Sequence, residues 1–120
     1  MIKEIEIFGK KVGEGHPTLI IAEVGLNHNG SVEIAKKLID LAVEAGCDAV
    51  KFQKRDVENL VTKEFLDAPD NRFPEFGKTY REVRNYVELD EAELAELKGY
   101  ANQRGVPFFV TPFDLKSAQM

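Results

Sequence analysis

The most informative pattern in the chain is an apolar run at residues 19–24, which contains one carboxylate, Glu23, and is followed by the segment GLNHNG at residues 25–30. Short runs rich in Leu, Ile and Val are typical of strands covered on both faces, as in parallel sheets. An unpaired charge inside such a strand costs on the order of several kcal/mol. Glu23 is therefore expected either at a ligand-binding carboxyl end of its strand or in an ion pair with a structural lysine.

A helix and a second strand follow. Residues 31–46 begin with a serine suited to capping, carry an apolar stripe at helical spacing and end in glycine, which predicts a helix. Residues 48–53 predict a strand, and the short joints imply a right-handed parallel unit. Lys51 and Gln53 lie two residues apart and face the same side of this strand. They predict an anion-binding site near Glu23, or a ligand-free ion pair between Lys51 and Glu23.

The N-terminal segment and the middle of the chain have weaker patterns. Residues 1–16 predict a short antiparallel hairpin with one dry face, followed by a loop. Residues 54–78 have no steady period and contain proline and glycine, which predicts a long loop at the ligand end of the sheet. Lys54, Arg55 and Lys63 in this loop are expected to be solvated.

The C-terminal third repeats the helix and strand pattern. Residues 80–87 predict a helix, and residues 90–104 predict a second helix that opens with a capping box. Residues 106–111 predict a third buried strand, which ends in the hydroxyl of Thr111. Residues 114–120 predict the cap and first turn of another helix.

Three successive strands therefore end in polar residues: a carboxylate, a lysine with a glutamine, and a hydroxyl. Sites built from successive strand ends at one face are typical of the (β/α)₈ barrel, which needs about 250 residues. The chain has 120 residues. We predict an α/β fold that is the N-terminal part of a (β/α)₈ TIM-type barrel, with residues 17–120 forming three βα units. Because its outer strand edges would be unpaired, we also expect a homo-oligomer, a dimer, or completion by further chain.

Composition narrows the range of functions and partners. The net charge is −5, and the sequence contains no basic stripe that could neutralise phosphates, which argues against nucleic acid as a partner. Cys47 is the only cysteine, so no intrachain disulfide can form, and a reducing cytoplasm is expected. No segment approaches 18 consecutive apolar residues, so no membrane span is expected. We predict a cytoplasmic protein.

The motifs together resemble the N-terminal third of the sialic acid synthase family, which comprises N-acetylneuraminate synthase and its relatives. The resemblance rests on IAEVGLNHNG at residues 21–30, VKFQ at residues 50–53 and VTPF at residues 110–113, and extends over residues 2–120. It implies a barrel followed, in full-length members, by an antifreeze-like domain. It also implies condensation of phosphoenolpyruvate with an N-acetylated hexosamine aldehyde such as N-acetylmannosamine, with release of phosphate. This chain alone is expected to be inactive.

The resemblance also implies roles for single residues. Lys51 and Thr111 match positions that hold phosphoenolpyruvate, and Gln53 lies beside them. Glu23 matches an acidic residue near the sugar aldehyde, where it would orient water or move a proton. Asn71 matches a sugar-contacting asparagine in the long loop. The family's divalent ion, manganese or magnesium, is held by two histidines from later strands, so its ligands are expected outside this chain.

Three alternatives stay open from the sequence. The acceptor sugar could make the enzyme a legionaminate or pseudaminate synthase. The chain could instead be a non-catalytic module that binds an anion or a partner through its open sheet edge; two strand-end histidines later in the reading frame would favour the enzyme. A third alternative is a Schiff-base aldolase that uses Lys51, which borohydride trapping with pyruvate would reveal.

Overall fold

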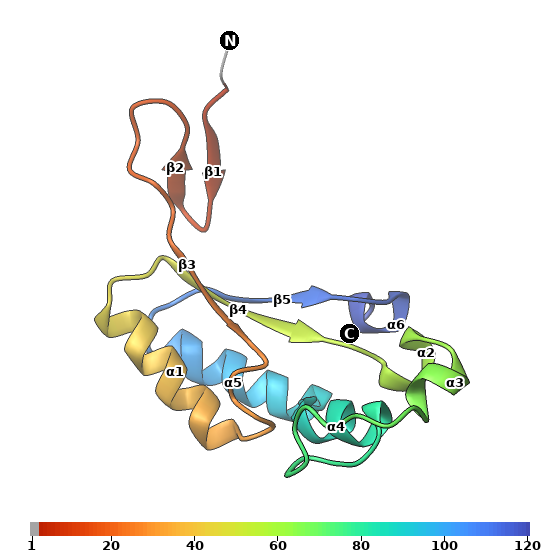
Figure 1. Ribbon diagram of the computed structural model, residues 1–120. Coiled ribbons are helices and arrows are strands. Elements are labelled where there is room, and N and C mark those ends of the chain that lie inside the picture. The colour runs from red at the N-terminus through yellow and green to blue at the C-terminus, as the bar shows by residue number, and fades with distance from the viewer. Residues whose placement is uncertain (1–2) are drawn as a thin grey trace.

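A computed structural model describes residues 3–120 of the chain (Figure 1). Its centre is a parallel sheet of three strands in the order β3–β4–β5, formed by Ile21–Gly25, Ala49–Lys54 and Phe108–Pro112. Helices α1 (Val32–Glu44) and α5 (Glu91–Gln103) pack against one face of this sheet, and the other face is open. The predicted α/β architecture with parallel strands joined through helices is confirmed.

The four predicted helices begin where the sequence places them, because polar side chains cap their first turns. Ser31 accepts a hydrogen bond from the backbone of α1, and Asp90 and Glu93 form the predicted capping box at the start of α5. Helices α4 (Tyr80–Val87) and α6 (Leu115–Ala118) begin after capping residues in the same way. Within residues 3–120, no helix is long and apolar enough to cross a membrane.

Side chains alternate across the central strand β4 and give the sheet two different faces. Val50 and Phe52 are fully buried and belong to the hydrophobic core formed with α1 and α5. Their neighbours in sequence point to the opposite face, because successive side chains of a strand alternate. The strands β3 and β5 each pair only with β4 among the described strands, so both outer edges of the sheet are unpaired, as the sequence predicted.

The N-terminal hairpin is present but lacks the predicted dry face. Strands β1 (Ile5–Ile7) and β2 (Lys10–Val12) pair antiparallel and stand away from the main sheet (Figure 1). Ile5 is 53% exposed, so the prediction of a dry face is wrong within the described residues. The hairpin instead makes one aromatic contact with the sheet, between the rings of Phe8 and Phe109, whose centroids lie 5.6 Å apart.

The predicted loop at residues 54–78 is only partly a loop. It contains the short helices α2 (Val57–Leu60) and α3 (Lys63–Leu66), and an isolated bridge joins Pro69 to Thr79. Each helix has four residues, which is too short to produce the apolar period by which longer helices are recognised. The expectation of a loop without structure is therefore corrected for residues 57–66.

The turn between β3 and α1 is packed tightly against α4. Gly25 and Gly30 both have positive φ, at 57° and 75°. A β-carbon on Gly30 would overlap the backbone carbonyl oxygen of Tyr86, at the end of α4. Glycine is therefore required at residue 30 by its backbone conformation and by the close approach of another backbone.

We expect Gly30→Ala to lower the free energy of unfolding by about 2 to 5 kcal/mol, the sum of left-handed backbone strain and overpacking. The matched control is Gly105→Ala, because Gly105 has a similar φ of 73° and open space around it. The control should lose only about 1 to 2 kcal/mol. Urea unfolding of the three proteins measures the difference, and equal losses would show that the contact with α4 is dispensable.

Candidate functional site

The open face of the sheet brings together the carboxylate and the lysine that the sequence singled out. Glu23 on β3 is directly paired with Lys51 on β4, and Lys51 Nζ lies 2.9 Å from Glu23 Oε1. The Lys51 side chain is 26% exposed and that of Glu23 is 61% exposed. The ion pair is thus accessible to a ligand on the open face.

Gln53 and Thr111 lie one step further toward the carboxyl ends of the strands. They are paired directly across β4 and β5, and their side chains emerge on the same face as Lys51. The amide nitrogen of Gln53 also reaches toward β3, since a β-carbon on Gly25 would lie 3.4 Å from Gln53 Nε2. The ladder shifts register between Glu23 and Gly25, a β-bulge of the kind found beside binding sites.

Asn71 is not part of this group. It is exposed in the segment between α3 and α4, and it lines a separate hollow of about 640 Å³. The walls of that hollow come from Val61, α3, α4 and the segment between these two helices, and none of the four strand residues contributes to it. The structure therefore brings together four of the five predicted site residues and leaves Asn71 apart.

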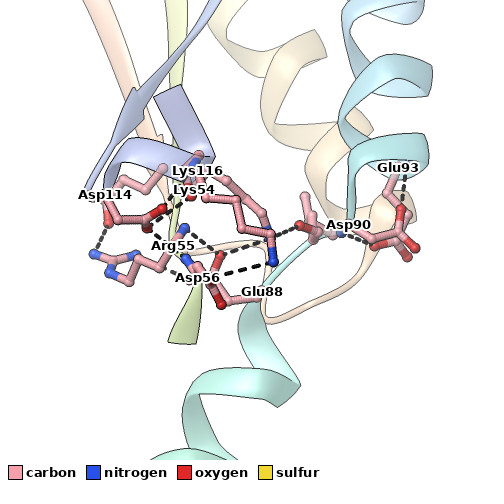
Figure 2. A network of polar contacts seen from close by, with 11 residues as sticks. Lys54, Arg55, Asp56, Glu88, Asp90, Glu93, Asp114 and Lys116 are labelled. Carbon is pink, nitrogen blue, oxygen red and sulfur yellow. Dashed lines mark hydrogen bonds and ion pairs between the residues drawn. The ribbon is translucent and has the colours of Figure 1, made fainter. Parts of the chain in front are cut away.

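The sequence placed Lys54 and Arg55 on a solvated surface, and for both residues this was wrong. The Arg55 side chain is 9% exposed and that of Lys54 is 15% exposed, whereas Lys63 is exposed as predicted. Both cations meet the carboxylate of Glu88, at the C-terminal end of α4, whose side chain is 7% exposed (Figure 2). Arg55 Nη1 lies 3.3 Å from Glu88 Oε1, and Lys54 Nζ lies 3.6 Å from Glu88 Oε2.

A second carboxylate ties the end of β5 to the end of β4. Asp114 Oδ2 accepts a hydrogen bond of 2.7 Å from the backbone N–H of Asp56, and the same side chain caps α6. Lys116 lies 3.4 Å from Asp56, which completes this charged network around the strand ends (Figure 2). The network fixes the two strand ends that carry Gln53 and Thr111.

His28 is a buried residue beneath this site. Its ring is fully buried, lies 5.8 Å from the ring of Phe52 and accepts a hydrogen bond of 3.1 Å at Nδ1 from the Gly30 N–H. Its Nε2 has no hydrogen-bond partner within residues 3–120. Burial lowers the pKa of His28, so the ring is neutral near pH 7. His28 therefore packs in the core as a neutral ring, beneath the strand that carries Lys51 and Gln53.

The described residues do not bring metal ligands together. Across residues 3–120, no three His, Cys, Asp or Glu side chains are placed to hold a metal ion. His16 contacts Glu4 near the hairpin, with 2.5 Å between Nε2 and Oε2, and so takes part in a local polar pair. The manganese or magnesium ion implied by the resemblance stays a prediction, with ligands expected outside this chain.

The fold and the placement of these side chains define a class of protein: the N-terminal part of a (β/α)₈ barrel with a polar site at the carboxyl ends of its strands. The chain belongs to the NeuB family, because the model of that family matches residues 38–120. The resemblance to sialic acid synthases inferred from the strand-end motifs is thereby confirmed, as is the predicted fold class.

Three relatives illustrate the family. The N-acetylneuraminate-9-phosphate synthase of Homo sapiens is 38% identical over 106 residues, which are 88% of this chain and 30% of the relative. The N,N'-diacetyllegionaminic acid synthase of Legionella pneumophila is 40% identical over 110 residues, 90% of this chain and 31% of the relative. The crystal structure of the N-acetylneuraminic acid synthetase from Leptospira borgpetersenii superposes with a TM-score of 0.74 at 30% identity, covering 99% of this chain and 37% of that one. The chain thus spans about a third of the length of these relatives.

The buried state of His28 predicts a pH dependence of stability. The unfolded chain binds a proton at this residue below about pH 6.5, whereas the native ring, with its lowered pKa, resists protonation. The free energy of unfolding should therefore fall as the pH drops below about 6.5. In His28→Asn, urea unfolding at pH 7.5 and about pH 5.5 should show a smaller loss than in the wild type. His16→Asn is the control, and an identical loss in His28→Asn and the wild type would contradict the assignment.

Proposed function

We propose that the protein is the substrate-binding part of a sugar-acid synthase that condenses phosphoenolpyruvate with an N-acetylated hexosamine aldehyde and releases phosphate. The observation that supports this most is the cluster of an ammonium, an amide and a hydroxyl beside a carboxylate, at adjacent strand ends of a NeuB-family chain. Relatives named as sialic and legionaminic acid synthases support the same class of reaction. N-acetylmannosamine is the first candidate for the acceptor sugar, and the precursor of a legionaminate-type sugar acid is the second.

Each residue of the cluster has a role in the proposed reaction. Lys51 neutralises the anionic donor, since an ammonium at a strand end binds carboxylate and phosphate oxygens. Thr111 and Gln53 supply hydrogen bonds to the same ligand from the next position along the strands. Glu23 lies 2.9 Å from the lysine, and it is placed to orient water or to move a proton beside the bound donor.

The geometry weighs against the aldolase alternative. A Schiff base forms from a neutral amine, and a desolvated lysine without an acidic partner is the usual way to obtain one. Lys51 instead is 26% exposed and has an acidic partner, because its Nζ lies 2.9 Å from Glu23 Oε1. The contact therefore supports a role in anion binding.

The dimer, the cytoplasmic location and the inactivity of this chain alone stay predictions.

In the full-length protein, phosphate release from phosphoenolpyruvate should depend on added N-acetyl sugar. Lys51→Ala should raise the KM for phosphoenolpyruvate by about 10- to 100-fold, the value of one or more charge-assisted hydrogen bonds. Lys36→Ala is a matched control, because Lys36 has a similar exposure of 28% and a carboxylate partner, Glu96, at 2.7 Å. An unchanged KM in Lys51→Ala would remove this residue from the site, and no phosphate release by the wild type with any N-acetyl sugar would refute the function.

We expect Glu23→Gln to lower kcat by about 100-fold, because the amide cannot accept the proton that a carboxylate accepts. The KM for phosphoenolpyruvate should stay within about threefold of the wild type, since the positive charge of Lys51 is retained. Steady-state kinetics with both substrates varied measure the two effects separately. Glu96→Gln is the control, and a turnover in Glu23→Gln equal to that of the wild type would exclude the proposed proton transfer.

A further inference from the structure

The side-chain amide of Gln53 has only one chemically allowed orientation in this structure. Arg55 Nη2 donates a hydrogen bond of 2.6 Å to Gln53 Oε1. A guanidinium group has donors and no acceptor, so the amide oxygen must face it and the NH₂ group must face the other way. The NH₂ group accordingly lies on the side of β3, near Gly25.

Arg55 is itself held on three sides. Its Nη1 lies 3.3 Å from Glu88 Oε1, and its backbone N–H donates a hydrogen bond of 3.1 Å to Glu88 Oε2. Its guanidinium carbon lies 3.9 Å from the centre of the Phe113 ring, a stacked cation–π contact. Arg55 as a whole is only 8% exposed. The guanidinium group therefore has little freedom to release the amide oxygen of Gln53.

We propose that Arg55 is a positioning residue that fixes the orientation of the Gln53 amide. In this orientation the NH₂ group of Gln53 can donate a hydrogen bond to an anionic oxygen of phosphoenolpyruvate. The inference rests on the proposed function. The Lys51 ammonium, the Gln53 NH₂ group and the Thr111 hydroxyl then form a set of donors, which suits a carboxylate or phosphate. The reversed amide would present a carbonyl oxygen to the anion and repel it.

The chemistry also predicts that a lysine cannot take over this role of Arg55. Arg55 contacts Glu88 with one nitrogen and Gln53 with another, and the planar guanidinium fork spans both partners. A lysine carries a single nitrogen at the end of its side chain. In Arg55→Lys the ammonium can retain the ion pair with Glu88, so the buried charge stays compensated while the contact with Gln53 is lost.

The test is a double-mutant cycle in the full-length protein with phosphoenolpyruvate as the ligand. Arg55→Lys should raise the KM for phosphoenolpyruvate about tenfold, the value of one ordered hydrogen bond to a charged group, and leave the KM for the sugar unchanged. Gln53→Glu keeps an acceptor for Arg55 but removes the donor, and should raise the same KM by about 100-fold. Because Arg55 acts through Gln53, the double variant should match Gln53→Glu alone.

Calorimetric titration with phosphoenolpyruvate and melting curves of each variant separate the outcomes. Arg104→Lys is the matched control, because Arg104 pairs with Asp40 on the helices, and it should bind as the wild type does. Two results would overturn the positioning role and leave the proposed function standing. One is wild-type affinity for phosphoenolpyruvate in Arg55→Lys, and the other is a loss of affinity in the double variant that equals the product of the two single losses. A wild-type protein that does not bind phosphoenolpyruvate would overturn the proposed function and this inference with it. If Arg55→Lys melts far below the wild type, the titration is carried out at a temperature at which this variant stays folded, and the same two outcomes then decide.

Discussion

The burial of Phe52 in the middle of β4 is the constraint on which the site depends. Its ring is fully buried beneath α1 and α5, and it lies 4.9 Å from the ring of Phe108 on the next strand. Burying a side chain of this size stabilises the fold by about 1.5 to 3 kcal/mol. Because a strand alternates its faces, this burial forces Lys51 and Gln53 onto the open face. A shift of the register by one residue would place the lysine in the core, so packing and site geometry are fixed together.

A second constraint acts at the end of the same strand, where charges are buried without being isolated. The carboxylate of Glu88 is compensated by Arg55 and Lys54, and the backbone N–H of Arg55 donates to it. Breaking such a pair by removing one partner costs about 3 to 5 kcal/mol, since the remaining charge is left uncompensated. Because of this cost, the ion pairs of Glu88 hold α4 against the end of β4. The position of α4 and the orientation of Gln53 are therefore linked through Arg55.

The sequence predicted the elements that depend on local chemistry and missed those that depend on distant partners. The bounds of the helix at residues 80–87 and the capping box at Asp90 follow from side chains within one turn of the helix end. The strand-end cluster was also predictable, because parallel strands bring their carboxyl ends to one edge. The burial of Arg55 was not predictable from the sequence, because its partner Glu88 is 33 residues away. Whether Glu88 is buried depends on how α4 packs. The single-turn helices at residues 57–66 were missed because they have no apolar period.

The open face of the sheet places an aromatic ring beside the ion pair, and this neighbour bears on how the ion pair works. Phe109 on β5 is paired directly with Lys51 on β4, and its ring contacts that of Phe8, whereas Gln53 and Thr111 form the next pair toward the carboxyl ends on the same face. An apolar floor lowers the local dielectric and strengthens the attraction between a lysine and an anion. On the proposed function, the anionic donor and Glu23 share the Lys51 ammonium, which would hold the carboxylate beside the bound donor. Binding of the donor and placement of the proton acceptor would then depend on the same lysine.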